Sequence, residues 1–178
     1  METTAAILLR KIPFSETSVI VSWLTEAHGK IKTVAKGARR PKSPFAGKLD
    51  LFFEAEIQWV RSRKSELHIL KELVLREPFD GLRARYDRTR LAAYFVELIE
   101  TVTEPEHAAP ELYDLMRRAL RYLNDGSATP RALLHFESEL TRLIGIHGQA
   151  GVTPAVAIGR AFGRLPSTRA ALLRELER

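Results

Sequence analysis

The chain has 178 residues, of which 45% are hydrophobic and 28% are charged, and it contains no cysteine. This composition fits one or two globular domains, and it excludes disulfides, thiolate metal sites and a membrane-spanning run of about 18 apolar residues. The net charge of +6 favours a polyanionic partner, and residues 1–77 hold most of the excess, with 14 Lys and Arg against 9 Asp and Glu.

Five strands are predicted in residues 1–77, from short runs rich in β-branched and aromatic residues that turn residues separate. The expected ranges are Thr4–Ile12, Thr17–Thr25, Lys30–Ala38, Leu49–Val60 and Glu66–Leu75. Trp23 and Trp59 are expected in the core. Because short antiparallel strands without intervening helices lose their open edges by closing on themselves, we expect an OB-like barrel.

A helical domain is predicted over residues 78–178, since the apolar period changes to three or four after Glu77. The fold class is therefore α+β, a five-stranded barrel followed by helices. The boundary signals predict a helix ending before Pro105, a second from Pro110 to before Gly126, a third from Thr129-Pro130 to before Gly145, and a short one over Ser167–Leu176. Residues 148–165 are expected to form a loop or a broken helix.

The segment Lys30–Lys48 carries seven basic residues and no acidic one. On a strand that reaches Ala38, Lys30, Lys32 and Lys36 point to the same side, and a loop beyond it adds further cations. A continuous positive strip on a barrel suits a phosphodiester backbone, because neutralised phosphates release their counterions. The expected DNA-binding residues are Lys30, Lys32, Lys36, Arg39, Arg40, Lys42 and Lys48.

Phe45 lies in the same loop and is expected to add base stacking. The alternative is that the basic segment is a solvated strand and linker whose charges only keep a sheet edge from aggregating. The density of cations without a carboxylate favours the binding interpretation.

The sequence offers no catalytic or metal site. The five histidines lack the spacing of metal ligands, and Glu54 and Glu56 fit the solvent-facing side of a strand. No nucleophile, base and orienting group can be assembled, so we expect a protein that is not an enzyme and that needs no cofactor and no metal. The first residues do not resemble a secretion signal, which favours a cytoplasmic location.

Four stretches resemble the N-terminal domain of the RecO family of bacterial recombination mediators. They are Ile7–Arg10, Ser15–Ser18, Leu24–Lys30 and, most specifically, Val34–Ser43. The order of barrel, Phe79-Asp80-Gly81-Leu82 and helices also resembles RecO, over about residues 1–146. The resemblance implies binding of single- and double-stranded DNA, annealing of complementary strands, and cooperation with RecR and single-stranded-DNA-binding protein to load RecA at the nucleoid.

The chain departs from the family pattern after Gly145. RecO proteins often carry a four-cysteine zinc module there and extend further, whereas this chain has no cysteine. We therefore expect a shortened helical domain that lacks the zinc module.

The resemblance also implies a site for the acidic, phenylalanine-ended tail of single-stranded-DNA-binding protein on the helical domain. Such a site needs an apolar pocket for the ring and nearby cations for the carboxylate. Arginines beside the apolar stripes of the second and third helices are the candidates: Arg117, Arg118, Arg121, Arg131 and Arg142. The alternative is that they are ordinary solvent-facing residues of core helices.

Two other functions stay open at this point. A generic single-strand-binding module for DNA or RNA would bind RNA equally well and would not anneal strands. A non-catalytic scaffold paralogue, whose basic segment is incidental, would show no salt-dependent DNA binding.

Overall fold

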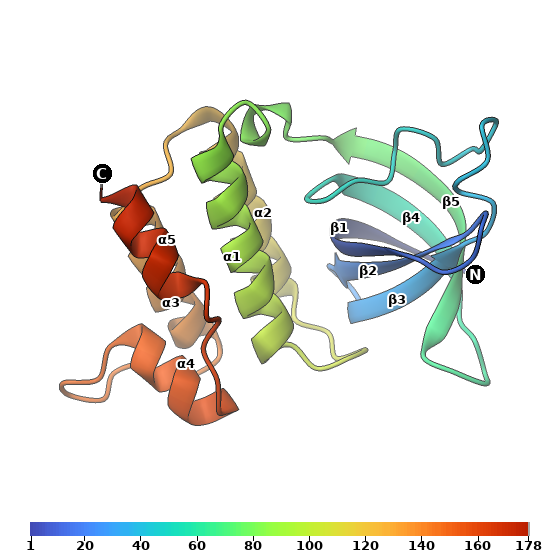
Figure 1. The fold of residues 1–178 in the computed structure, drawn as a ribbon. Coiled ribbons are helices and arrows are strands. Elements are labelled where there is room, and N and C mark those ends of the chain that lie inside the picture. The colour runs from blue at the N-terminus through green and yellow to red at the C-terminus, as the bar shows by residue number, and fades with distance from the viewer. Residues whose placement is uncertain (178) are drawn as a thin grey trace. The chain divides into compact units, whose positions relative to one another are not determined.

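The computed structural model describes residues 1–177, which form two compact units (Figure 1). The first unit comprises Met1–Pro78 and Thr103–Tyr113, and the second comprises Phe79–Val102 and the residues from Asp114 onward. Residues 103–113 belong with the barrel through backbone contacts: the Glu106 amide donates to the Lys30 carbonyl at 2.9 Å, and Pro105 forms a parallel bridge with Lys30. A cut at one position in the sequence therefore does not separate the two units.

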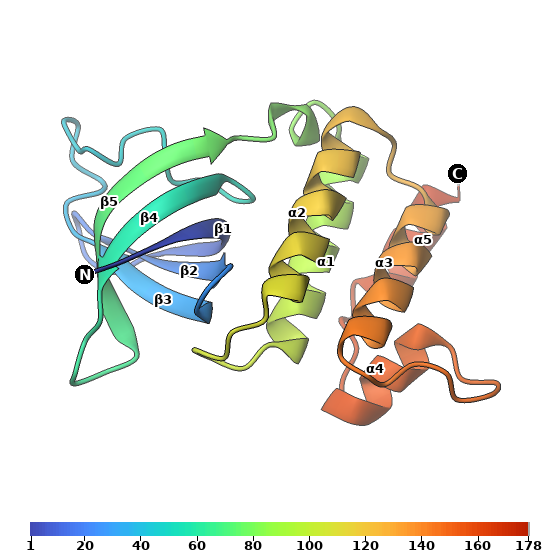
Figure 2. The same ribbon diagram turned by 180° about the vertical axis from the view of Figure 1, so that it is seen from behind.

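The first unit is built on a closed barrel, which the ribbon views show from two sides (Figures 1 and 2). Within residues 1–177 its strands are β1 (Glu2–Pro13), β2 (Val19–Thr25), β3 (Gly29–Ala35), β4 (Glu54–Val60) and β5 (Leu67–Glu77). They follow the order β1-β2-β3-β5-β4, with β3 and β5 parallel and the other neighbours antiparallel. The expected OB-like barrel is confirmed.

Strand β1 closes the barrel because it is long enough to pair with two neighbouring strands. Its first half pairs with β4, its second half pairs with β2, and the register shifts by a bulge between Leu8 and Arg10, where the strand can bend. Trp23 and Trp59 are fully buried inside, as expected. At the first residue of β3, Gly29 has φ of 66°, and a Cβ there would lie 1.9 Å from the His107 carbonyl oxygen, so only glycine fits.

The segment between β3 and β4, residues 36–53, is a loop, which we call the basic loop. The predicted third strand was too long, because β3 ends at Ala35 and a turn follows in which Gly37 has φ of 69°. The predicted fourth strand began too early, because pairing starts at Glu54, after Phe52 with φ of 71°. The positive φ angles at both ends explain why neither strand extends into the loop.

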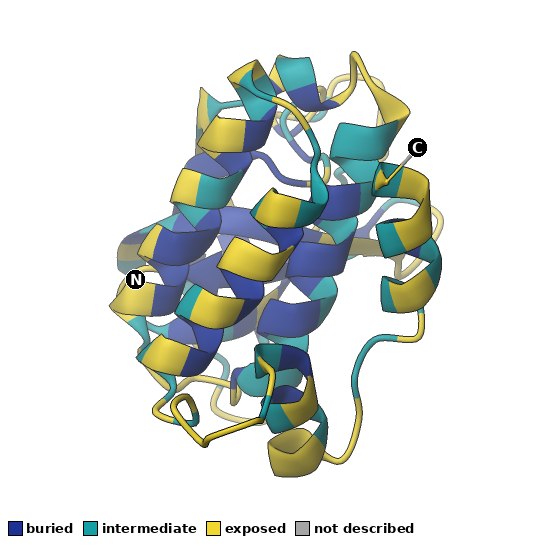
Figure 3. Cartoon of the chain, turned by 90° about the vertical axis from the view of Figure 1, so that its left-hand side faces the viewer, coloured by how far each residue is buried: buried dark blue, intermediate teal, exposed yellow. Residues whose placement is uncertain are grey.

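The helices are α1 (Tyr86–Val102), α2 (Pro110–Asp125), α3 (Pro130–Leu143), α4 (Pro154–Phe162) and α5 (Arg169–Leu176), preceded by a 3-10 turn, Asp80–Leu82. Buried residues lie along one side of the helices and exposed residues along the other (Figure 3). In the second unit Phe95 of α1 stacks on Phe136 of α3, with ring centroids 3.9 Å apart.

Helix α4 lies in the segment expected to be a loop or a broken helix. Thr153 caps it by accepting a hydrogen bond from the Val156 amide at 3.4 Å, and Pro154 occupies its first turn. Gly163, with φ of 71°, ends it. The Thr-Pro pair is the same boundary signal that predicted α3 correctly at Thr129-Pro130.

Candidate nucleic-acid interface

The outer face of β1, β2 and β3 carries two rows of side chains that the strand register brings side by side. Val21, Trp23 and Ile31 point into the core, so the alternate residues of these strands point outward. One outward row pairs Arg10 with Ser22 and Ser22 with Lys32. The next row pairs Ile12 with Ile20 and Ile20 with Val34. We call these two rows the barrel face.

Hydrogen bonds fix the basic loop against the β1–β2 turn, residues 14–18. The Arg39 amide donates to the Thr17 carbonyl at 2.9 Å, and its guanidinium donates to the Ser15 carbonyl at 3.0 Å. The Gly37 amide donates to the Ser18 hydroxyl at 3.3 Å. Arg39 therefore serves partly as a structural tether between the two segments.

A hollow of about 370 Å³ lies between the turn and the start of the basic loop. Phe14 and Ser18 contribute from the turn, Val34 contributes from the barrel face, and Lys36 and Arg40 contribute from the loop. The hollow thus combines two cations with an aromatic ring and an aliphatic side chain.

The cations expected in the DNA site separate into groups. Lys36 and Arg40 line the hollow, Lys32 lies one row away on the barrel face, and Arg39 and Lys42 are exposed in the loop. Lys48 is half-buried near the loop's end.

The expected strip is not continuous along one strand, because Lys36 follows the end of β3. Lys30 lies at the opposite end of that strand, about 20 Å from Lys36 at the rise of an extended chain, and borders a small pocket with Pro105, Glu66 and Glu106.

Four cations on the barrel face, at the hollow and in the basic loop lack acidic partners in the described part of the chain. Within residues 1–177 no carboxylate forms an ion pair with Lys32, Lys36, Arg40 or Lys42. By contrast, Lys11 lies 3.5 Å from Asp50 and donates to the Leu49 carbonyl, so it is engaged in holding the end of the loop. Unpaired cations of this kind are available to phosphate groups.

The expected stacking role of Phe45 is wrong. Phe45 is only 6% exposed and packs in the barrel core, because the successive turns of the loop fold its ring back over the strands. Phe14 is the aromatic residue of this region that solvent reaches, with 57% of its surface exposed. Its position in a strand-connecting turn beside Pro13 and Ser15 is the sequence signal that could have identified it.

A cluster of rings and charges lies elsewhere on the first unit. His68 is buried and stacks on Trp59, and its Nε2 lies 3.0 Å from a Glu106 oxygen while its Nδ1 accepts from the Ser62 amide. Arg61 also contacts Glu106, and this hydrogen bond raises the pKa of the Arg61 guanidinium. The cluster fastens residues 103–113 to the barrel. No group of His, Asp and Glu with metal-binding geometry occurs in residues 1–177.

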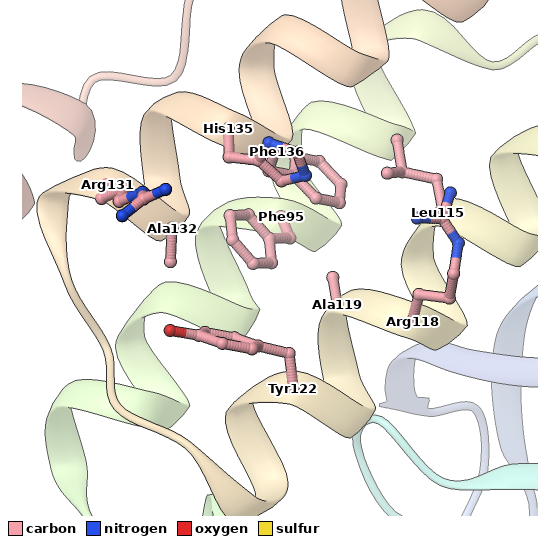
Figure 4. A pocket seen from close by; sticks show the side chains of 9 residues that line it. All are labelled: Phe95, Leu115, Arg118, Ala119, Tyr122, Arg131, Ala132, His135 and Phe136. Atoms are coloured by element: carbon pink, nitrogen blue, oxygen red, sulfur yellow. The ribbon is translucent and has the colours of Figure 1, made fainter.

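The second unit contains a pocket of about 600 Å³ between α1, α2 and α3, and Figure 4 shows its lining. Phe95, Phe136 and Leu115 supply apolar surface, and Arg118 and Arg131 supply the charge.

Two of the five predicted arginines therefore reach one pocket. Arg117, Arg121 and Arg142 do not line it. Arg142 forms an ion pair with Glu139 at 2.9 Å, which lowers the pKa of that carboxyl, and Arg118 forms one with Asp114 at 2.8 Å. Tyr122, 53% exposed, and His135 also line the pocket and were not predicted.

None of the helices within residues 1–177 has the length and apolar character needed to cross a membrane.

Two family models match the chain. The model described as Recombination protein O N terminal matches residues 1–79, and the model described as Recombination protein O C terminal matches residues 83–147. Together they cover the barrel and the helices α1 to α3.

Several relatives named DNA repair protein RecO are similar to the chain. The Rhodopirellula baltica protein is 35% identical over 140 residues, which are 79% of this chain and 52% of the relative. The Desulfatibacillum aliphaticivorans protein is 35% identical over 69% of this chain and 48% of its own length. The Idiomarina loihiensis protein is 33% identical over 79% of this chain and 59% of its own length. The chain spans about half the length of these relatives.

Proposed function

Because the chain belongs to the RecO family, we propose that it is a mediator of recombinational DNA repair that binds single- and double-stranded DNA and anneals complementary strands. It helps to load the recombinase onto strands that single-stranded-DNA-binding protein coats, in cooperation with RecR. It acts by binding rather than by catalysis, in the cytoplasm at the nucleoid.

One observation carries the DNA-binding part of the proposal. Lys32 lies on the β1–β2–β3 face of an OB-like barrel, Lys36 and Arg40 line the hollow beside it, and none of the three has a carboxylate partner in residues 1–177. In OB-folds the face of strands 2 and 3 and the loop between strands 1 and 2 bind oligonucleotides. A chain of phosphates along this face would neutralise the exposed cations and release counterions.

Annealing follows from the same electrostatics. Two complementary strands repel each other through their phosphates, and cations that neutralise some of these phosphates lower the repulsion before base pairs form. The unspecific nature of such contacts suits a protein that must accept any sequence.

The test is the annealing of complementary strands coated with single-stranded-DNA-binding protein, with and without this chain. We expect the chain to accelerate annealing, and the variant K36Q/R40Q/K42Q, which we call the loop variant, to lose most of the acceleration. The matched control R160Q/R164Q/R174Q removes the same charge from exposed positions in and after α4 and in α5, and it should behave as the unmodified chain. An unmodified chain that does not accelerate annealing would refute the proposal.

We assign the docking of the binding protein's C-terminal tail to the pocket between α1, α2 and α3. Phe95, Phe136 and Leu115 line the pocket that would take the terminal phenylalanine ring, and Arg118 and Arg131, on opposite sides of it (Figure 4), would supply cations for the acidic tail and its carboxylate. Arg117, Arg121 and Arg142 lie outside the pocket, and we assign them no part in the docking.

A further inference from the structure

We propose that the hollow beside Phe14 is a stacking subsite for an unpaired base, which makes the barrel face prefer single-stranded over double-stranded DNA. The inference rests on the proposed DNA binding and adds a base contact to the phosphate contacts. It replaces the stacking role that Phe45 cannot fill.

The Phe14 ring is exposed on a backbone that is held in place. The Phe14 amide donates to the Ser18 carbonyl at 3.0 Å, and the Ser18 amide donates to the Ser15 hydroxyl at 3.1 Å. An exposed ring on an ordered turn loses little conformational freedom when a partner covers it. The site is therefore preorganised for a flat apolar ligand.

Aliphatic side chains border the Phe14 ring. Val34, 7% exposed, forms part of the wall of the same hollow, and the register places the half-buried Ile20 and then Ile12, 54% exposed, beside it. Ile12 is thus the exposed aliphatic residue of this row, and it extends the apolar surface that Phe14 offers to a planar ring.

The surrounding charges select the ligand. Lys36 and Arg40 line the hollow, and Lys32 lies in the neighbouring row, so the apolar surface is bordered by cations that lack acidic partners within residues 1–177. A ligand that fits both features is a polyanion that carries flat rings at short intervals, which describes a single strand of DNA. In a duplex the faces of the bases are already stacked on one another, so they are hidden from Phe14.

The test compares F14A, F14L and F14W in their binding to a single-stranded oligonucleotide, to the same oligonucleotide with abasic sites, and to a duplex, by fluorescence anisotropy. F14A and F14L should weaken single-strand binding by about 5- to 150-fold and leave duplex binding unchanged, whereas F14W should bind single strands at least as tightly as the unmodified chain. Abasic sites should weaken the unmodified chain and have little effect on F14A.

The control is V74A, which shortens another exposed apolar side chain, 60% exposed on β5, and should change neither affinity. Equal losses for single strands and duplexes, or full binding by F14L, would overturn the stacking subsite while DNA binding itself stands. If the unmodified chain bound none of the three ligands in a salt-dependent way, the proposed function itself would be overturned.

Discussion

At the scale of single residues, the most demanding environment is that of Glu137 in the second unit. Its carboxylate is fully buried and accepts from the Tyr94 hydroxyl at 2.5 Å and from two nitrogens of Arg169 at 2.6 and 2.8 Å. A buried carboxylate is costly unless it is paired and hydrogen-bonded, and these three donors offset that cost. The contact also ties α5 to α3.

Tyr94 makes the stability of the chain depend on pH in the alkaline range. Burial, together with the negative charge of Glu137, raises the pKa of the Tyr94 hydroxyl above its ordinary value. Above about pH 10 the unfolded chain therefore releases this proton while the folded chain keeps it, so folding stability falls as the pH rises, by up to about 1.4 kcal/mol per pH unit. Y94F should be less stable at pH 8, by about 1–3 kcal/mol for the missing hydrogen bond.

Urea denaturation between pH 8 and 11 measures both effects. The difference between the unmodified chain and Y94F should narrow above pH 10, because Y94F no longer has the group that titrates. Y122F, which changes an exposed ring, should run parallel to the unmodified chain. If the difference in the free energy of unfolding between Y94F and the unmodified chain stayed constant from pH 8 to 11, the pKa of the Tyr94 hydroxyl would not be raised in the folded chain.

The exposure of single side chains was the hardest property to infer from sequence. Phe14 and Phe45 both lie in polar connecting segments, and only the path of the loop decides that the second is buried. Glu54 fitted the solvent-facing side of β4 by its period, yet it is 6% exposed and accepts from the buried Tyr113 hydroxyl at 3.0 Å. That contact joins residues 59 positions apart, which no local pattern contains.

At the scale of elements, the spacing of apolar residues and the residues at element boundaries predicted most of the strands and helices. The elements that were predicted wrongly have local causes. Residues 36–38 continue the composition of β3, but the positive φ of Gly37 turns the chain away. Helix α4 begins with a Thr153-Pro154 cap, but the glycines before it weaken the apolar period, so periodicity alone did not predict it. Cap residues were therefore the better guide there than periodicity.

The pocket between α1, α2 and α3 forms only when these helices pack together, since Arg118 comes from α2 and Arg131 from α3. A fluorescent acidic peptide ending in Pro-Phe should bind in the micromolar range, more weakly at higher salt, and removal of its last phenylalanine should abolish binding. R118A and R131A should each weaken it by about 1.5–3 kcal/mol, the range for a hydrogen bond to a charged group. R121A, outside the pocket, is the control; equal losses for R121A and R131A would contradict the assignment.

At the scale of the whole molecule, the uneven distribution of charge predicts that the first unit carries the proposed polyanion site. The excess of basic residues lies in residues 1–77, and one face of the barrel displays cations that have no acidic partner among the described residues 1–177. The sequence could not show that Lys30 lies at the far end of β3, or that Arg39 is engaged with Ser15. Both corrections come from the three-dimensional path of the chain.

The salt dependence of single-strand binding tests the central claim most directly. The loop variant K36Q/R40Q/K42Q spares Arg39, so it removes cations without removing the tether of the loop. The plot of log affinity against log salt concentration should flatten by about 2 for this variant, at about 0.7 for each phosphate that is no longer neutralised, while R160Q/R164Q/R174Q keeps the slope of the unmodified chain. Equal slopes for the two variants, with both folded by circular dichroism, would contradict the assignment of DNA binding to the barrel.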